Sequence, residues 1–418
     1  MIGPSGPFAL DSMDAFLSRS VALLVVAILV AIIARRLRLP YTVGLVVTGI
    51  GLALARLGSG AMLTHDFIFE VILPPLLFEA ALSLHWDELR RDWVPVTVLS
   101  VLGVVISAIV VGLGMEHLLD WPLPAAALFG VLIAATDPVA VIALFKDTGV
   151  KGRLKLLVES ESLFNDGVAA VLFGLVLSWA EMAPGRGVTP LQVIADLVVV
   201  AGGGIFVGVA VGMAAIAAAG RTKDHLVETA VTAAAAYGSF LLAGRLHTSG
   251  VLAVVAAGLV MGNIGVLRDQ GRGTLSAQGR AFVTAFWEFA AFIANSLVFL
   301  LIGLKIGELP TTERSIGMFV AAIGLVQLGR ILTVYPLCLL FRSSRWAISL
   351  GQQHVLFWGG LRGALALALA LALPPDIPHH DAILVAAFAV VAFSVVVQGV
   401  TMPLLLKSLG FLPRRTKR

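Results

Sequence analysis

Five charged residues lie within long apolar stretches of this 418-residue chain. They are Asp137, Glu161, Asp166, Arg330 and Arg362. A charged side chain at the centre of a bilayer costs roughly 2.5–3.5 kcal/mol on insertion scales, so such residues line a path or pair with one another. A carboxylate can bind a proton, and oxygen ligands also suit hard metal cations. The five residues therefore indicate binding of protons and cations inside an apolar protein.

The segment that carries two of these acids presents two polar faces if it is a helix. Glu159, Ser162 and Asp166 are spaced i, i+3 and i+7 and share one face. Glu161 and Asn165 are spaced i, i+4 and share another. We predict that the first face binds a cation or a proton at Asp166, and that Glu159 attracts cations at the entrance.

Two predicted helices are interrupted in the middle of the membrane. One break is Thr136-Asp137-Pro138, and the other is the glycine-rich run 359–363. Pro138 lacks a backbone donor and disturbs the preceding turn, which frees carbonyl groups near Thr136 to face a cavity. Interrupted helices in matching positions indicate a binding site in transporters. The alternative for Asp137 is a structural role, in which it accepts hydrogen bonds from loose backbone donors of a proline kink.

The five deep charges leave one carboxylate in excess. We predict that Glu161 pairs with Arg362 and Asp137 with Arg330, which leaves Asp166 unpaired. One carboxylate that exchanges one proton for one monovalent cation moves no net charge. The sequence therefore favours electroneutral exchange at Asp166.

The composition is that of a membrane protein. Hydrophobic residues make up 59% of the chain and charged residues 13%, whereas a soluble domain has about 25% charged residues. A large soluble helical protein is therefore excluded. The single cysteine, Cys338, rules out an intrachain disulfide. No HExxH or GxSxG motif indicates an enzyme. Gly202-Gly203-Gly204 has no phosphate-binding continuation, so we expect helix packing there and no cofactor.

Apolar runs of spanning length recur along the whole chain. They predict an all-α polytopic membrane protein with about thirteen transmembrane helices, at residues 15–35, 40–56, 66–84, 93–116, 122–146, 153–180, 189–219, 224–243, 248–266, 279–304, 314–341, 352–373 and 381–409.

Lysine and arginine set the expected orientation. With the N-terminus outside, 21 of the 29 basic residues fall in cytoplasmic segments, as the positive-inside rule requires. If helix 7 is a linker, helices 1–6 and 8–13 form two inverted six-helix repeats. Helices 5 and 12, which carry the two breaks, are then counterparts.

Five segments resemble one known family, the monovalent cation:proton antiporters that include NhaP proteins and eukaryotic sodium/proton exchangers. The segments are 135–141 (ATDPVAV), 161–167 (ESLFNDG), 360–364 (GLRGA), 73–80 (LPPLLFEA) and 39–43 (LPYTV). The resemblance implies a thirteen-helix antiporter with a mobile core, a dimerisation scaffold and crossed broken helices. The implied scaffold helices are residues 15–90 and 224–305, the core helices 93–180 and 314–410, the linker helix 189–219, and a short basic cytoplasmic tail 411–418.

The resemblance also assigns roles to the site residues. Asp166 is similar to the family's cation- and proton-binding aspartate, and sodium is expected at Asp166, Ser162 and Thr136. Asn165 and Asp137 belong to the same implied binding set, and an Asn-Asp pair is associated with electroneutral exchange. Glu161 and Arg362 resemble a buried ion pair. Arg330 and Pro138 resemble residues that support the helix crossing.

The sequence thus favours a sodium/proton antiporter that works by alternating access. Potassium/proton exchange on the same fold remains open, and a cation channel is a remote alternative. The expected partners are Na⁺, with Li⁺ or K⁺ as possible substitutes, protons, the lipid bilayer and a second copy of the chain, but no nucleic acid. The expected location is the inner membrane, with the N-terminus outside and the C-terminus in the cytoplasm.

Overall fold

The computed structural model describes residues 7–37, 40–56, 64–181, 190–267, 274–308 and 313–411. The predicted tail 411–418 therefore lies almost entirely outside the described residues. Within those ranges every regular element is a helix, apart from one isolated β-bridge between Asp137 and Leu361. The all-helical prediction is confirmed.

The first half of the chain contains ten elements up to the long helix α9. They are α1 (Pro7–Leu37), α2 (Tyr41–Leu54), the π-helical turn η1 (Phe67–Ile72), α3 (Leu73–Ser83), α4 (Trp86–Leu89), α5 (Trp93–Leu119), α6 (Leu123–Leu132), α7 (Val139–Thr148), α8 (Arg153–Ala180) and α9 (Pro190–Ala219).

The second half repeats the pattern of long helices and one interrupted helix. Its elements are α10 (His225–Arg245), α11 (Gly250–Met261), η2 (Gly262–Val266), α12 (Ala277–Gly307), α13 (Glu313–Leu340), α14 (Leu350–Gly359), α15 (Ala364–Leu371), α16 (His380–Phe393), η3 (Ser394–Gln398) and α17 (Gly399–Ser408).

Each of the thirteen predicted ranges coincides with one helix or with consecutive helical pieces. Seven described helices are long and apolar enough to cross a membrane, and four shorter apolar helices accompany them. The chain is therefore an integral membrane protein. The number of crossings stays a prediction, because the interrupted and short helices do not meet the length of a full span by themselves.

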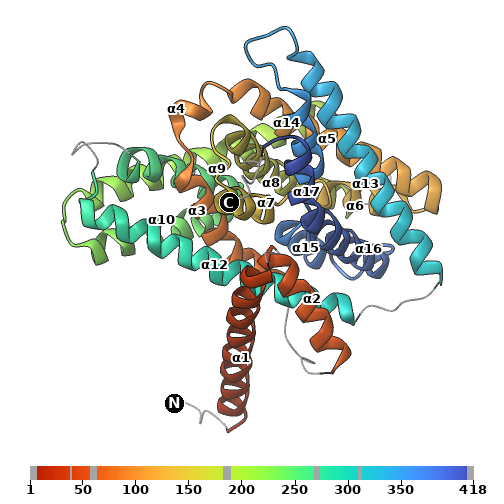
Figure 1. Ribbon diagram of the computed structural model, residues 1–418, viewed down its shortest axis with the longest axis horizontal. Coiled ribbons are helices and arrows are strands. Elements are labelled where there is room, and N and C mark those ends of the chain that lie inside the picture. Colours follow the sequence, from red (N-terminus) through yellow and green to blue (C-terminus); the bar gives the residue numbers. More distant parts are fainter. Residues whose placement is uncertain are drawn as a thin grey trace, which may run out of the picture.

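The helices form one body, from which α1 projects (Figure 1). Helices α9, α10 and α12 lie on one side, α5, α6, α13 and α16 lie on the other, and α7 and α8 lie between them (Figure 1). Helix α2 packs along α12, α9 along α11, and α13 along α5. A compact apolar cluster that includes Leu157, Phe145 and Val355 joins α7, α8 and α14.

Small residues allow the closest helix contacts. A Cβ atom on Gly303 would lie 2.2 Å from the Val46 carbonyl oxygen, so α2 and α12 touch backbone to backbone. A Cβ atom on Gly204 would lie 2.4 Å from the Ser249 carbonyl oxygen, and one on Gly203 would meet Thr248. The prediction that this glycine run serves helix packing is confirmed at Gly203 and Gly204, as is common where membrane helices approach closely.

Candidate ion-binding site

The two interrupted helices cross where their extended segments meet. Helix α6 ends at Leu132 and α7 begins at Val139, while α14 ends at Gly359 and α15 begins at Ala364. Between them the Asp137 N–H donates to the Leu361 carbonyl oxygen at 2.7 Å. Both predicted helix breaks are therefore present, and one backbone–backbone hydrogen bond joins them.

The segment between α14 and α15 requires glycine, because neighbouring side chains occupy the positions that its Cβ atoms would take. A Cβ atom on Gly363 would lie 1.9 Å from Oδ2 of Asp137, and one on Gly360 would lie 2.6 Å from Nε of Arg330. Both distances are shorter than any van der Waals contact. The glycine-rich run thus makes room for an acid and a base.

Four half-helix ends border the crossing, and charged side chains contact backbone groups at the end of α6 and the start of α7. Asp137 Oδ1 accepts from the Val139 N–H at 2.9 Å, at the positive end of α7. Arg362 donates from Nη1 to the carbonyl oxygens of Ala134 and Ala135, which follow the negative end of α6. These charges oppose the helix dipoles and satisfy backbone groups that the breaks leave open. The hydrogen bond that Asp137 accepts from the Val139 N–H therefore supports a structural role for this residue.

Glu161 pairs with Arg330 and not with Arg362. Arg330 Nη1 lies 2.7 Å from Glu161 Oε1, and Nη2 lies 3.0 Å from Oε2, a two-pronged geometry. Both side chains are deeply buried, with 4% of Glu161 and 6% of Arg330 exposed. Arg330 also donates to the Leu356 carbonyl oxygen of α14 at 2.9 Å, so it contacts both α8 and α14.

The predicted pairs were wrong because both arginines lie at the crossing and the sequence does not say which helix face each acid meets. Arg362 is committed to carbonyl oxygens of α6, and Asp137 to a backbone N–H. Among the described residues, neither forms a salt bridge. The net charge of the five residues is unchanged, since Glu161 and Arg330 cancel, but Asp137 and Asp166 both lack an ionic partner; Asp137 differs in accepting a backbone N–H.

A chain of polar groups links α8 to the first break. Ser162 Oγ donates to the Thr136 carbonyl oxygen. Thr136 Oγ1 donates to Ser162 Oγ at 3.3 Å, and Asn165 Nδ2 donates to Thr136 Oγ1 at 3.3 Å. All three residues are buried. Asn165 therefore joins Ser162 in one network, although the helical wheel placed it on a different face from Ser162.

Two buried oxygen atoms beside this network have no hydrogen-bond partner. They are Oδ1 of Asn165 and Oδ1 of Asp166. Burying a polar oxygen without a partner costs about 1–3 kcal/mol, which a bound proton or cation relieves. In the part of the chain that the structure describes, Asp166 forms no salt bridge with a basic side chain, since the buried Arg330 is paired with Glu161 and Arg362 donates to backbone carbonyl oxygens. The atoms are suited to a small hard cation.

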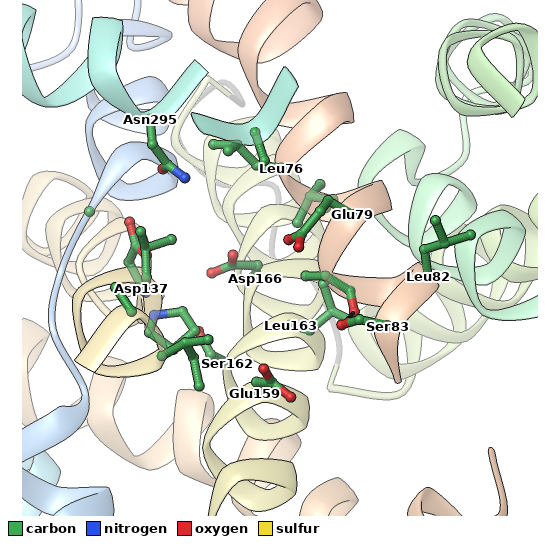
Figure 2. Close-up of a pocket in the computed structure, with 18 of the residues that line it drawn as sticks. Leu76, Glu79, Leu82, Ser83, Asp137, Glu159, Ser162, Leu163, Asp166 and Asn295 are labelled. Carbon is green, nitrogen blue, oxygen red and sulfur yellow. Dashed lines mark hydrogen bonds between the residues drawn. The ribbon is translucent and has the colours of Figure 1, made fainter. Parts of the chain in front are cut away.

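Asp166 lines a cavity of about 510 Å³ that also reaches Thr136, Asp137, Ser162 and Pro138. Figure 2 shows Asp166 on α8 directed into the space between the first break and α3, with Ser162 and Glu159 on the same helix. The lining includes Gly363 and Ala364 from the second break. All predicted members of the binding set except Asn165 are therefore among the lining residues.

The wider part of the cavity carries further charges. Glu159 lines it and lies 3.3 Å from Lys155, and its role at the entrance stays a prediction. Glu79 and Glu288 also line it, with Lys146 between them.

Asn295 was missed altogether. It lies on α12, is 6% exposed and lines the cavity, and Figure 2 shows its side chain near those of Asp137 and Asp166. Its Oδ1 has no hydrogen-bond partner. The signal was available, because Asn295 and Ser296 are two adjacent polar residues in a long apolar run.

Comparison with known proteins identifies a family, relatives and a solved structure to which this chain is similar. Residues 22–408 match the profile of the family described as sodium/hydrogen exchanger, transmembrane. The chain is 39% identical over 382 residues to the Na⁺/H⁺ antiporter ApNhaP of Aphanothece halophytica, covering 91% of this chain and 72% of the relative. It is 35% identical to the Na⁺/H⁺ antiporter NhaH of Halobacillus aidingensis, covering 93% and 96%. The solved structure of the sodium proton antiporter MjNhaP1 from Methanocaldococcus jannaschii superposes with a TM-score of 0.74 at 21% identity, covering 95% of this chain and 99% of that one.

Proposed function

This chain belongs to the sodium/hydrogen exchanger family, and we propose that it exchanges sodium ions for protons across a membrane. We propose further that one monovalent cation and one proton compete for Asp166. The observation that carries this proposal is the position of Asp166, which faces the cavity with a buried oxygen that has no partner. A carboxylate that holds either a proton or a cation, but not both, couples the two fluxes.

The oxygen atoms around Asp166 are suited to bind a cation together with its carboxylate. Besides Asp166, it includes the unpartnered Oδ1 of Asn165 and the hydroxyl groups of Ser162 and Thr136. All are oxygen atoms, as hard cations prefer. Ser162 and Thr136 are already bonded to one another, so a cation would have to share or replace those bonds.

The charge arrangement supports electroneutral exchange. Glu161 is neutralised by Arg330, and Asp137 and Arg362 meet opposite helix ends. We propose that Asp166, whose Oδ1 has no hydrogen-bond partner, is the carboxylate that gains and loses charge in each cycle. Exchange of one proton for one monovalent cation at that carboxylate does not respond to membrane voltage.

Alternating access requires one part of the protein to move against another. We propose that α5–α8 and α13–α17 move as a core that carries Asp166, while α1–α3 and α10–α12 form a scaffold. The apolar cluster that joins α7, α8 and α14 supports movement of these helices together. We further propose an inner-membrane homodimer with the N-terminus outside.

Exchange in sealed proteoliposomes tests the proposal. A pH gradient is imposed, and Na⁺, Li⁺ or K⁺ is added with and without a valinomycin clamp. We expect Na⁺ to collapse the gradient equally with and without the clamp, and Asp166→Asn to be inactive. Asp381→Asn is the matched control, because that carboxylate is 98% exposed. If only K⁺ collapsed the pH gradient, the transported cation would be K⁺ and not Na⁺. If the rate of collapse depended strongly on membrane voltage, the single-carboxylate mechanism would be contradicted.

A further inference from the structure

Lys146 is an exposed lysine that lines the cavity and forms ion pairs with two acids. Its ammonium nitrogen lies 3.7 Å from Oε1 of Glu79 and 3.6 Å from Oε1 of Glu288. The three residues come from three different helices, α7, α3 and α12. One positive charge is therefore shared between two carboxylates, which come from the neighbouring helices α3 and α12.

These charges belong to the same cavity as Asp166. Glu79, Lys146 and Glu288 all line it, together with Asp166. Figure 2 shows the Glu79 carboxylate directed from α3 into the space beside Asp166. A cation that reaches Asp166 through this cavity passes the two carboxylates, and it competes there with the Lys146 ammonium.

The ammonium is held loosely. Both distances exceed the 2.7–3.2 Å of a direct N–H···O bond. The Lys146 side chain is 52% exposed and that of Glu288 is 57% exposed. Exposed ion pairs of this kind contribute little to folding, so loss of the lysine should change the charge of the cavity while the helices keep their positions.

We propose that Lys146 sets the affinity of the exchanger for its cation by neutralising the carboxylates of Glu79 and Glu288. The inference rests on the proposed exchange at Asp166 and assigns Lys146 no contact with the bound cation. Without the ammonium, Lys155, which pairs with Glu159, would be the remaining lysine of the lining. The cavity would then carry one positive charge fewer, and the local cation concentration would rise.

The size of the effect follows from Coulomb's law. A unit charge about 4 Å from another in water changes local occupancy by about fivefold. Salt shortens the Debye length from about 30 Å at 0.01 M to about 10 Å at 0.1 M. The effect of Lys146 should therefore be largest at low ionic strength and shrink when an inert salt is added.

The test measures KM for Na⁺ in proteoliposomes at alkaline pH, where protons compete least, at two concentrations of choline chloride. We expect Lys146→Gln to lower KM by about fivefold at low ionic strength, with kcat retained and the difference reduced by choline chloride. Lys146→Arg should behave as wild type, because it keeps the charge. Lys305→Gln is the matched control, since Lys305 also bonds an acid, Glu308 at 2.9 Å, but does not line the cavity.

An unchanged or higher KM in Lys146→Gln would overturn the inference while leaving the proposed exchange intact, provided that wild type exchanges Na⁺ and Asp166→Asn does not. A lower KM that Lys305→Gln reproduces would also overturn it, because the effect would then be one of net charge. A wild type without any Na⁺-dependent exchange would refute both the inference and the proposed function.

Discussion

Replacing the charges of Glu161 and Arg330 tests which arginine holds the buried acid. The pair is almost fully enclosed and two-pronged. Removal of one partner leaves the other charge buried and alone, which costs about 3–5 kcal/mol. Glu161→Gln and Arg330→Met should each lose that much, while the double variant should lose less than the sum of the two.

The loss converts into a measurable shift of melting temperature. An unfolding entropy of about 2.1 cal/mol/K per residue gives roughly 0.9 kcal/mol/K for the 418 residues. Each single variant should therefore melt about 3–6 °C below wild type. Thermal unfolding of the purified protein in detergent, followed by size-exclusion chromatography of the surviving fraction, measures this shift.

Two charge swaps identify the partner. Glu161→Arg with Arg330→Glu should recover part of the stability lost in either single swap, because the pair is rebuilt in reverse. Glu161→Arg with Arg362→Glu should recover nothing, because an acid at position 362 would face the carbonyl oxygens of Ala134 and Ala135. Recovery by the Arg362 swap alone would refute the geometry described above.

Two further predictions concern the crossing and the ligand network. Gly363→Ala should greatly reduce Na⁺-driven proton flux in proteoliposomes, since the added Cβ would overlap the Asp137 carboxylate, whereas Gly174→Ala, with nothing within 4 Å, should keep full flux and gain about 0.5–1 kcal/mol in thermal stability. Equal fluxes in the two variants would show that the crossing tolerates a side chain. Ser162→Ala and Asn165→Ala should each raise KM for Na⁺ by roughly tenfold, the equivalent of one lost oxygen ligand at about 1.4 kcal/mol. An unchanged KM in both would remove these residues from the binding set.

Much of the fold could be predicted because membrane solvation constrains the sequence strongly. Runs of apolar residues predict helices, and Pro138 and the glycine run 359–363 predict where two of them are interrupted. The π-helical turn η3 carries no comparable signal, since neither proline nor a charge stands at its boundaries, whereas Asp66 and Pro74 flank η1.

Most residues of the candidate site could be proposed from the sequence, but Asn295 was missed and the pairing of the buried charges could not be predicted. Asp166, Ser162 and Thr136 follow from residue type and helical spacing. The choice between Arg330 and Arg362 depends on the angle at which two broken helices cross, and periodicity along one helix does not contain that angle. Asn165 shows the same limit, because it reaches Thr136 only after the first break brings that residue against α8.

The crossing also has a consequence for how the protein is made. Glu161 lies 169 residues before Arg330 in the chain, and Asp137 is synthesised long before Leu361, whose carbonyl group accepts its N–H. The first six predicted helices therefore enter the membrane with a buried acid and an open backbone that only the last three can complete. A ribosome-bound chain ending near α9 should keep these helices loosely assembled and exposed to membrane quality control. Assembly of the site is thus a late step of biogenesis, which is completed only after the second interrupted helix has been inserted.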